Sequence, residues 1–272
     1  MSEIQPLPAA TVTLVRDSDA GPEVLMLQRN FQSGFMPGMY MFPGGALDAS
    51  DYSREASALC RGLDDAAASG ILKLERGGLA YWIAAIRESF EEAGILLACD
   101  ARGEFVALDD PAAMERFGAR RHALNSGEQA FTALIAAEHL RLAVDQLVYF
   151  GHWITPVGAP RRYDTRFFIA RAPAAQVPLH DNVEAIAHKW VRPQAALAAH
   201  ARGEFNMRTP TLKTLESFAR FAAVGELVAA MRALHEIPAM LPRIAQDGRR
   251  LLPGEAGYEE AAAAGSRGRW ET

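Results

Sequence analysis

Cysteine is nearly absent from this chain of 272 residues, which contains only Cys60 and Cys99. Two thiols are too few for a disulfide framework or a thiolate metal cluster, so we expect both to be free in a reducing compartment. Histidine is also scarce, and the spacing of His152, His180 and His188 does not indicate a zinc site. The chain must therefore be held together by its hydrophobic core.

A basic excess and a long apolar run are also missing. The formal net charge is −5 and the pI about 5.8, so no general positive field attracts nucleic acid. No stretch approaches the length of a membrane span, and residues 1–8 lack the basic start and apolar run of a secretory signal. We expect a cytoplasmic protein that acts on a small molecule and binds neither nucleic acid nor membrane. The sequence is also compatible with a homodimer.

Three acidic residues stand out in the stretch 87–95, which reads Arg-Glu-Ser-Phe-Glu-Glu-Ala-Gly-Ile. At about 100° per residue, Glu91 and Glu92 fall about 60° to one side and about 40° to the other side of Glu88. Apolar residues occupy the opposite arc, so the helix can bury that face while the acids face solvent. Clustered carboxylates suit Mg²⁺ or Mn²⁺, which relieve their repulsion. The alternative is a solvated helix face without a ligand.

A glycine turn precedes this helix, because residues 42–48 read Phe-Pro-Gly-Gly-Ala-Leu-Asp. Such a turn lets the backbone approach a ligand closely. The combination resembles the Nudix hydrolases, whose box reads glycine, five residues, glutamate, seven residues, and then Arg-Glu-x-x-Glu-Glu-x-Gly. Gly45 and the stretch 87–95 match this box. The sequence departs from the box in two ways: Asp51 stands at the glutamate position, and the segment 52–86 takes the place of the seven residues between that glutamate and the arginine.

The departures define an insertion inside the box, at about residues 52–78. An insertion at this point is similar to one branch of the family, the peroxisomal-type coenzyme A diphosphatases. Further stretches similar to that branch are residues 24–29, 34–38, 44–49, 153–156 and 162–168. A longer coenzyme A signature is met only in part, since Gly34 stands at its second arginine position. The insertion is placed to act as a flap that selects substrate, or is a surface elaboration.

The order of apolar patterns predicts an α+β fold. Residues 9–16 and 23–29 indicate a hairpin with a longish turn over 17–22. Further strands are expected at 95–98, 147–154, 163–171 and 184–191, and helices at 54–63, 128–139, 193–201, 211–224 and 226–235, with the arginines 116, 120 and 121 on a solvated helix face. The resemblance likewise implies a mixed sheet between helices, an α/β/α sandwich. We expect a Nudix domain over 1–205 and a C-terminal helical extension over 206–272, packed on the same domain.

The resemblance also assigns roles to residues. It implies that Glu88, Glu91 and Glu92 bind Mg²⁺ or Mn²⁺, with the carbonyl group of Gly45 as a further ligand. Arg87 is expected to pair with a carboxylate and hold the helix against the glycine turn. These four charged residues are the expected catalytic residues, with Glu88 favoured as the base over Glu184, Asp181 and Asp164. The expected substrate-binding residues are Arg29, Phe42, Gly44, Arg162 and Glu184; Phe35, Met36 and Tyr40 are candidates for an apolar wall.

The reaction implied is attack of water on a pyrophosphate. The leading substrate is coenzyme A or acyl-coenzyme A, and the alternatives are ADP-ribose, NADH or a nucleotide sugar. A Nudix-fold module that binds a nucleotide without turnover is a third hypothesis, motivated by Asp51 and by the divided box.

Overall fold

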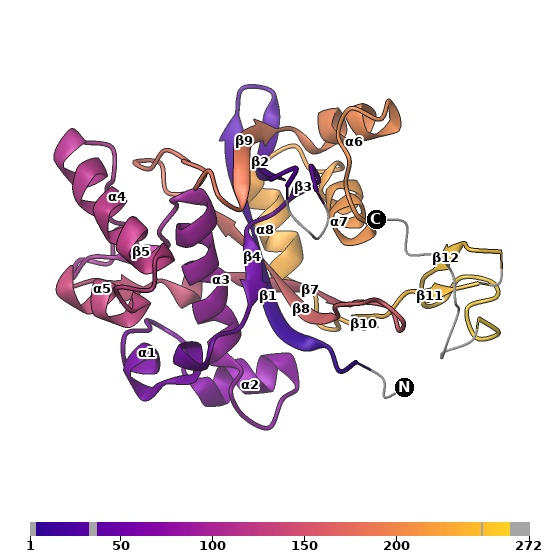
Figure 1. The fold of residues 1–272 in the computed structure, drawn as a ribbon, viewed down its shortest axis with the longest axis horizontal. Coiled ribbons are helices and arrows are strands. Elements are labelled where there is room, and N and C mark those ends of the chain that lie inside the picture. Colours follow the sequence, from indigo (N-terminus) through magenta and orange to yellow (C-terminus); the bar gives the residue numbers. More distant parts are fainter. Residues whose placement is uncertain (1–3, 33–36, 246, 262–272) are drawn as a thin grey trace.

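A computed structural model describes residues 4–32, 37–245 and 247–261 (Figure 1). Its strands are β1 Leu7–Ser18, β2 Gly21–Arg29, β3 Tyr40–Met41, β4 Gly44–Ala46, β5 Ala98–Cys99, β6 Arg141–Leu142, β7 Val148–Ile154, β8 Tyr163–Arg171, β9 Ala185–Val191, β10 Ala239–Met240, β11 Arg243–Ile244 and β12 Arg250–Leu251. Its helices are α1 Arg54–Ala58, α2 Asp65–Leu72, α3 Leu79–Ala93, α4 Pro111–Asn125, α5 Phe131–Ala137, α6 Pro193–Ala201, α7 Thr209–Phe218 and α8 Val224–Arg232, with short 3-10 turns η1 Ala49–Tyr52 and η2 Val144–Gln146.

A mixed eight-stranded sheet forms the centre of the fold. Its main order is β10-β7-β8-β1-β2-β3, while β4 pairs with β1 and β9 pairs with β2. β1 runs parallel to β8 and antiparallel to β2. The expected hairpin is confirmed, but its turn is tighter than predicted because Ser18 still pairs with Gly21.

Alternating side chains on the central strands supply two separate cores. On β2, Leu25 and Leu27 pack with α3, while Val24 and Met26 pack with α6, α7 and α8 on the opposite face. On β8, Phe168 and Ala170 belong to the first core, and Phe167 and Ile169 belong to the second. This period of two is what a strand covered on both faces requires. The expected α/β/α layering is confirmed, and Figure 1 shows α3 on one side of β1 and α8 on the other.

The insertion is more helical than the sequence indicated. The helix predicted over residues 54–63 is the short α1, and the Ala-rich stretch that follows folds as α2, which begins after the cap residue Asp64. The strand predicted at 95–98 instead forms at Ala98–Cys99, in a small separate sheet with β6. Local pattern did not reveal this sheet because its partner lies far along the chain.

The segment after residue 205 is joined to the sheet. α7 and α8 contribute to the second core, and β10 pairs with the edge strand β7. β11 and β12 pair with each other in a separate two-stranded sheet, away from the main sheet (Figure 1). The division of the chain at residue 205 stays a prediction.

Within the described residues, no helix is both long enough and apolar enough to cross a membrane, and both cysteines are buried and free.

Candidate active site

Helix α3, which carries the acidic stretch, is held at both ends by side chains from other elements. At its start, the Asp65 carboxylate accepts hydrogen bonds from the backbone amides of Gly77 at 2.9 Å and Leu79 at 3.0 Å. Ser69 accepts from Gly78 at 2.9 Å. These contacts satisfy amides that a helix start leaves without partners. The insertion therefore fixes the position of the acidic helix.

At the other end of α3, Gly94 adopts a left-handed conformation with φ +70°, which glycine tolerates best. The carbonyl oxygen of Glu91 accepts from Arg121 Nε at 3.0 Å and Nη2 at 2.8 Å, and from the Asn125 side chain at 3.2 Å. The prediction that Arg121 lies on a solvated helix face is wrong, because it is buried and caps α3. Its neighbours Arg116 and Arg120 do lie at the surface side, where both pair with Glu138.

The acids of α3 are more buried than the helical wheel predicted. Glu92 is 3% exposed and Glu88 is 9% exposed, because the glycine turn covers them. The backbone amide of Gly44 donates to Glu92 Oε2 at 3.0 Å. A Cβ atom on Gly45 would lie 2.6 Å from Glu88 Oε1, so any larger residue here would require the Glu88 carboxylate to move. The expectation that the acids face solvent is therefore wrong for these two residues.

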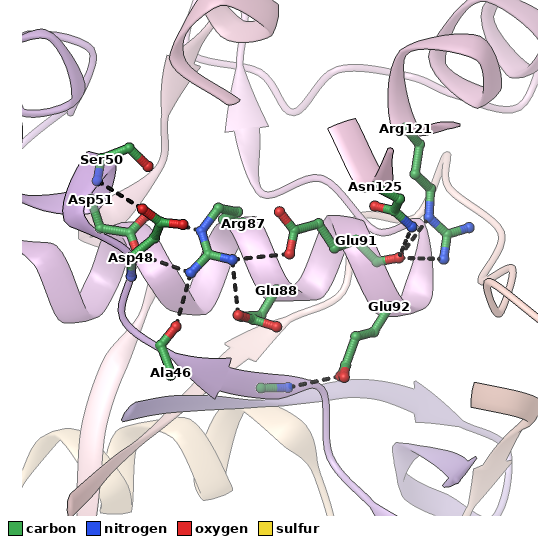
Figure 2. A network of polar contacts seen from close by, with 11 residues as sticks. Ala46, Asp48, Ser50, Asp51, Arg87, Glu88, Glu91, Glu92, Arg121 and Asn125 are labelled. Carbon is green, nitrogen blue, oxygen red and sulfur yellow. Dashed lines mark hydrogen bonds and ion pairs between the residues drawn. The ribbon is translucent and has the colours of Figure 1, made fainter. Parts of the chain in front are cut away.

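Arg87 forms the centre of a buried polar network (Figure 2). Its Nη1 contacts Glu88 Oε1 at 2.8 Å and Glu91 Oε2 at 2.9 Å. Its Nη2 donates to the carbonyl oxygen of Ala46 at 3.1 Å. A two-pronged ion pair with Asp51 completes the set, with Nε to Oδ1 at 3.0 Å and Nη2 to Oδ2 at 2.9 Å. Arg87 thus links the acidic helix to the glycine turn and to η1.

Asp51 is the functional residue that sequence reasoning undervalued. It was treated as a departure from the box, yet its carboxylate supplies the partner that Arg87 was expected to have. Its Oδ2 also accepts from the backbone amide of Asp48 at 2.7 Å. The available signal was its position, separated from Gly45 by five residues, where the box has its glutamate. A shorter acid serves here because η1 brings its backbone close to α3.

Burial and mutual repulsion shape the electrostatics of the cluster. Burial raises the pKa of Glu88 to about 7 against the pull of Arg87, with Glu91 and Glu184 adding to the rise. Burial also raises the pKa of Glu92 well above its ordinary value, together with the charges of Glu88 and Glu184. The pKa of Glu91 is raised by burial as well. The site therefore concentrates negative charge that a cation would stabilise.

The donor set fits a hard divalent cation. Glu92 Oε1 is buried and has no hydrogen-bond partner among the residues that the structure describes, and an unpartnered buried oxygen is a costly feature that a ligand would relieve. Among the described residues, no three acidic, histidine or cysteine side chains are already gathered closely enough to hold a metal. In this arrangement the guanidinium group of Arg87 neutralises Glu88 and Glu91. Carboxylate oxygens with a nearby backbone carbonyl are the ligands that Mg²⁺ and Mn²⁺ prefer.

Two of the expected substrate-binding residues meet beside this cluster. Arg29 forms an ion pair with Glu184 at 2.6 Å, and the charge of Glu184 influences Glu88 and Glu92. Gly44 also lies at the cluster, through its hydrogen bond to Glu92.

The other two expected substrate-binding residues, Phe42 and Arg162, contact the protein itself. Phe42 is 3% exposed and packs in the second core. Arg162 is buried and donates to the carbonyl oxygens of Thr155 at 3.0 Å and Ile4 at 2.7 Å. Of the wall candidates, Tyr40 stacks on Phe205 with ring centroids 3.5 Å apart, and Phe35 and Met36 lie outside the described residues. Their substrate-binding roles stay predictions.

Comparison with known proteins identifies the family. The model of the NUDT19 Nudix domain matches residues 64–218. The chain belongs to the Nudix hydrolases. Two relatives are 30% identical to it: the acyl-coenzyme A diphosphatase NUDT19 of Xenopus laevis, over 88% of this chain and 72% of that protein, and the same-named protein of Homo sapiens, over 88% and 73%. A crystal structure of a Nudix hydrolase from Alicyclobacillus acidocaldarius is 28% identical, with a TM-score of 0.69, over 86% of this chain and 99% of that one.

Membership settles the class of protein. This Nudix hydrolase is an enzyme, and the Nudix fold expected from the box is confirmed. The hypothesis of a binding module without turnover rested on Asp51 and on the divided box. Asp51 supports the network through Arg87, and the divided ends of the box meet in space because Gly45 lies against Glu88. Nudix hydrolases generally use divalent metals, in agreement with the acid cluster.

The raised pKa of Glu88 predicts how stability depends on pH. The pKa of Glu88 is about 7 in the folded protein against an ordinary value of 4.5, so the folded state binds this proton more tightly than the unfolded state does. The resulting stabilisation is complete below about pH 4.5 and is lost as the pH rises through 7. It amounts to at most roughly 3 kcal/mol. We expect the free energy of unfolding in EDTA to fall between pH 5 and pH 7.5, measured with urea.

The matched variant for this measurement is Glu88→Gln, which cannot titrate. Its pH slope should be shallower than that of the wild type over the same range. Added Mn²⁺ should stabilise the wild type more at pH 7.5 than at pH 5, because the cation competes with protons for the carboxylates. Equal slopes in the two proteins would show that Glu88 is not the titrating group.

Proposed function

We propose that this enzyme hydrolyses the pyrophosphate bond of coenzyme A or acyl-coenzyme A. The products are 4′-phosphopantetheine, or its acyl form, and adenosine 3′,5′-bisphosphate. The reaction type is supported by one observation above all: Glu88 and Glu91 pair with Arg87 on α3, and next to them the buried Glu92 has an oxygen without a hydrogen-bond partner among the described residues. The substrate is supported by relatives whose names state acyl-coenzyme A diphosphatase, among them those of Xenopus laevis and Homo sapiens.

Mg²⁺ or Mn²⁺ is the proposed cofactor. Glu88, Glu91 and Glu92 would hold it, and the backbone carbonyl of Gly45 is the proposed further ligand, since the Cα atom of this glycine lies against the Glu88 carboxylate. When bound, the cation neutralises charge on the phosphoryl oxygens and lowers the pKa of the attacking water. The chain's own contribution is a rigid set of oxygens, since Arg87 and Gly44 orient the glutamates before substrate arrives.

Of the four acids considered as the base, two have their oxygens committed elsewhere. Asp164 is paired with His152 and Arg166, and Asp181 accepts from the backbone amides of residues 183–185. The other two lie at the acid cluster, where Glu88 pairs with Arg87 and Glu184 pairs with Arg29. We favour Glu88, because it lies on the acidic helix α3 directly against the glycine turn.

Substrate binding is proposed for residues at both sides of the cluster. Arg29 is placed to exchange its partner Glu184 for a diphosphate oxygen. The backbone at Gly44 approaches closely enough to contact the phosphates beside Glu92. Phe42 and Arg162 are proposed to act indirectly, by packing beneath the turn and by fixing the start of β8.

Product analysis tests the proposal. The purified protein is incubated with Mg²⁺ or Mn²⁺ and, in parallel, with coenzyme A, dephospho-coenzyme A, ADP-ribose, NADH or a nucleotide sugar, and products are separated by chromatography. We expect adenosine 3′,5′-bisphosphate from coenzyme A at the highest kcat/KM, and no turnover in EDTA. Faster hydrolysis of ADP-ribose, NADH or the nucleotide sugar would retain the reaction and reject the substrate. The absence of turnover of every compound would reject the reaction.

A further inference from the structure

The insertion forms a cavity beside the acid cluster. Its three short elements, η1, α1 and α2, together with the start of α3, border a half-open pocket of about 740 Å³. We call this cavity the insertion pocket. The residues of its lining that carry charge or an aromatic ring are Asp51, Tyr52, Arg54, Asp65 and Arg76.

The two acids of the insertion pocket are already engaged by protein donors. Both oxygens of Asp51 receive Arg87, and both oxygens of Asp65 receive backbone amides at the start of α3. The two arginines differ. Within the part of the chain that the structure describes, Arg54 and Arg76 are exposed and neither forms an ion pair or side-chain hydrogen bond. The pocket thus presents two guanidinium groups whose donors are available to a ligand.

An aromatic ring lies beside these two arginines. Tyr52 is 49% exposed, and its ring packs near the backbone of Gly77, where a Cβ atom would lie 3.1 Å from Tyr52 Cε1. A half-exposed ring can pack on the flat face of a nucleoside. Two guanidinium groups that line one pocket balance the charge of a phosphate monoester dianion, and each can donate to its oxygens. Ring and arginines together indicate a site for a phosphorylated nucleoside.

The insertion pocket is also connected to the acid cluster. Asp51 lines the pocket and holds Arg87, and Arg87 contacts Glu88 and Glu91. Figure 2 shows Asp51 at one end of this row of side chains and Glu92 toward the other. The insertion pocket therefore shares Asp51 with the network that holds Glu88 and Glu91.

We propose that the insertion pocket binds the phosphorylated adenosine end of coenzyme A, with Arg54 and Arg76 donating to the 3′-phosphate and Tyr52 packing against the nucleoside. This rests on the proposed function, which supplies the substrate. It makes the insertion a specificity element: the acid cluster recognises the diphosphate, and the insertion recognises the phosphate that ADP-ribose and NADH lack.

The test compares coenzyme A with dephospho-coenzyme A, which differ only in the 3′-phosphate. The double variant Arg54→Gln/Arg76→Gln should lower kcat/KM for coenzyme A by about 10- to 100-fold, the loss expected for two charge-assisted contacts. For dephospho-coenzyme A it should stay within about twofold of the wild type. The matched control is Arg102→Gln/Arg202→Gln, which removes the same charge from exposed pairs with Asp100 and Glu204 and should change neither value.

Equal losses with the two substrates, or no loss with either, would overturn the proposal. If the double variant does not fold, the single variants are measured in the same way, each with a smaller selective loss. Calorimetric binding of adenosine 3′,5′-bisphosphate separates this proposal from the proposed function. If the wild type releases no product from coenzyme A, the proposed function fails. In that case, weaker binding to the double variant still supports the pocket, and equal binding rejects it.

Discussion

Replacing Glu92 by glutamine is expected to lower kcat for pyrophosphate hydrolysis by about a thousandfold, because a cation ligand is worth several kcal/mol in the transition state. The amide retains the shape of the side chain and an oxygen that can accept from Gly44. The substitution removes the negative charge of Glu92, which is destabilised by burial and by the neighbouring charge of Glu88. The metal-free variant should therefore be at least as stable as the wild type. Product release with Mn²⁺ and urea unfolding in EDTA measure the two effects.

The matched control is Glu216→Gln on α7, where the carboxylate pairs at the surface with Lys213. This change removes the same charge far from the acid cluster in sequence, so kcat should remain within about twofold and stability within about 1 kcal/mol. If Glu92→Gln keeps more than a tenth of the wild-type kcat, Glu92 is not a ligand. Strong destabilisation of the metal-free variant would mean that the carboxylate is needed for folding.

Replacing Asp51 by asparagine is expected to lower the free energy of unfolding by about 3 kcal/mol. Asp51 is buried and forms a two-pronged ion pair with Arg87, and removing one partner leaves the other charge uncompensated. Activity should also fall, because Arg87 orients Glu88 and Glu91. Urea unfolding gives the first effect and kcat with Mn²⁺ gives the second.

A neighbouring aspartate provides the control. Asp48 is exposed and caps η1, a position where asparagine serves as well as aspartate. Asp48→Asn should therefore change stability by less than about 1 kcal/mol. Similar losses in the two variants would indicate that η1 itself, rather than the ion pair, is what matters. Asp51→Glu is the informative third variant, since it restores the residue of the family box but requires η1 to move.

Short-range pattern was sufficient for much of the fold. The apolar arc of α3, its end at Gly94 and the glycine turn are all local, and the structure places them where expected. Strands β7 and β8 and helix α6 were predicted within a residue of their ends because alternation and a starting proline are strong signals. The second helix of the insertion was missed, since an Ala-rich polar stretch has no clear apolar face.

Long-range contacts explain what the pattern could not provide. Arg121 was expected in solvent because its own helix, α4, has no marked apolar face, yet it is buried where α4 reaches the end of α3. The burial of Glu88 and Glu92 follows from coverage by a turn about forty residues earlier in the chain. The helical wheel describes one helix at a time and contains no information about such coverage.

The sequence by itself determined the family, the acidic helix and the glycine turn, because these depend on residue types at fixed local spacing. Only the tertiary structure decided which carboxylate pairs with Arg87, that the insertion caps α3, and that Arg54, Arg76 and Tyr52 share one pocket. These facts depend on where the chain returns after an insertion, and spacing along the sequence does not measure distance in space. The energies of burial and ion pairing, and hence the raised pKa of Glu88, depend on that same arrangement.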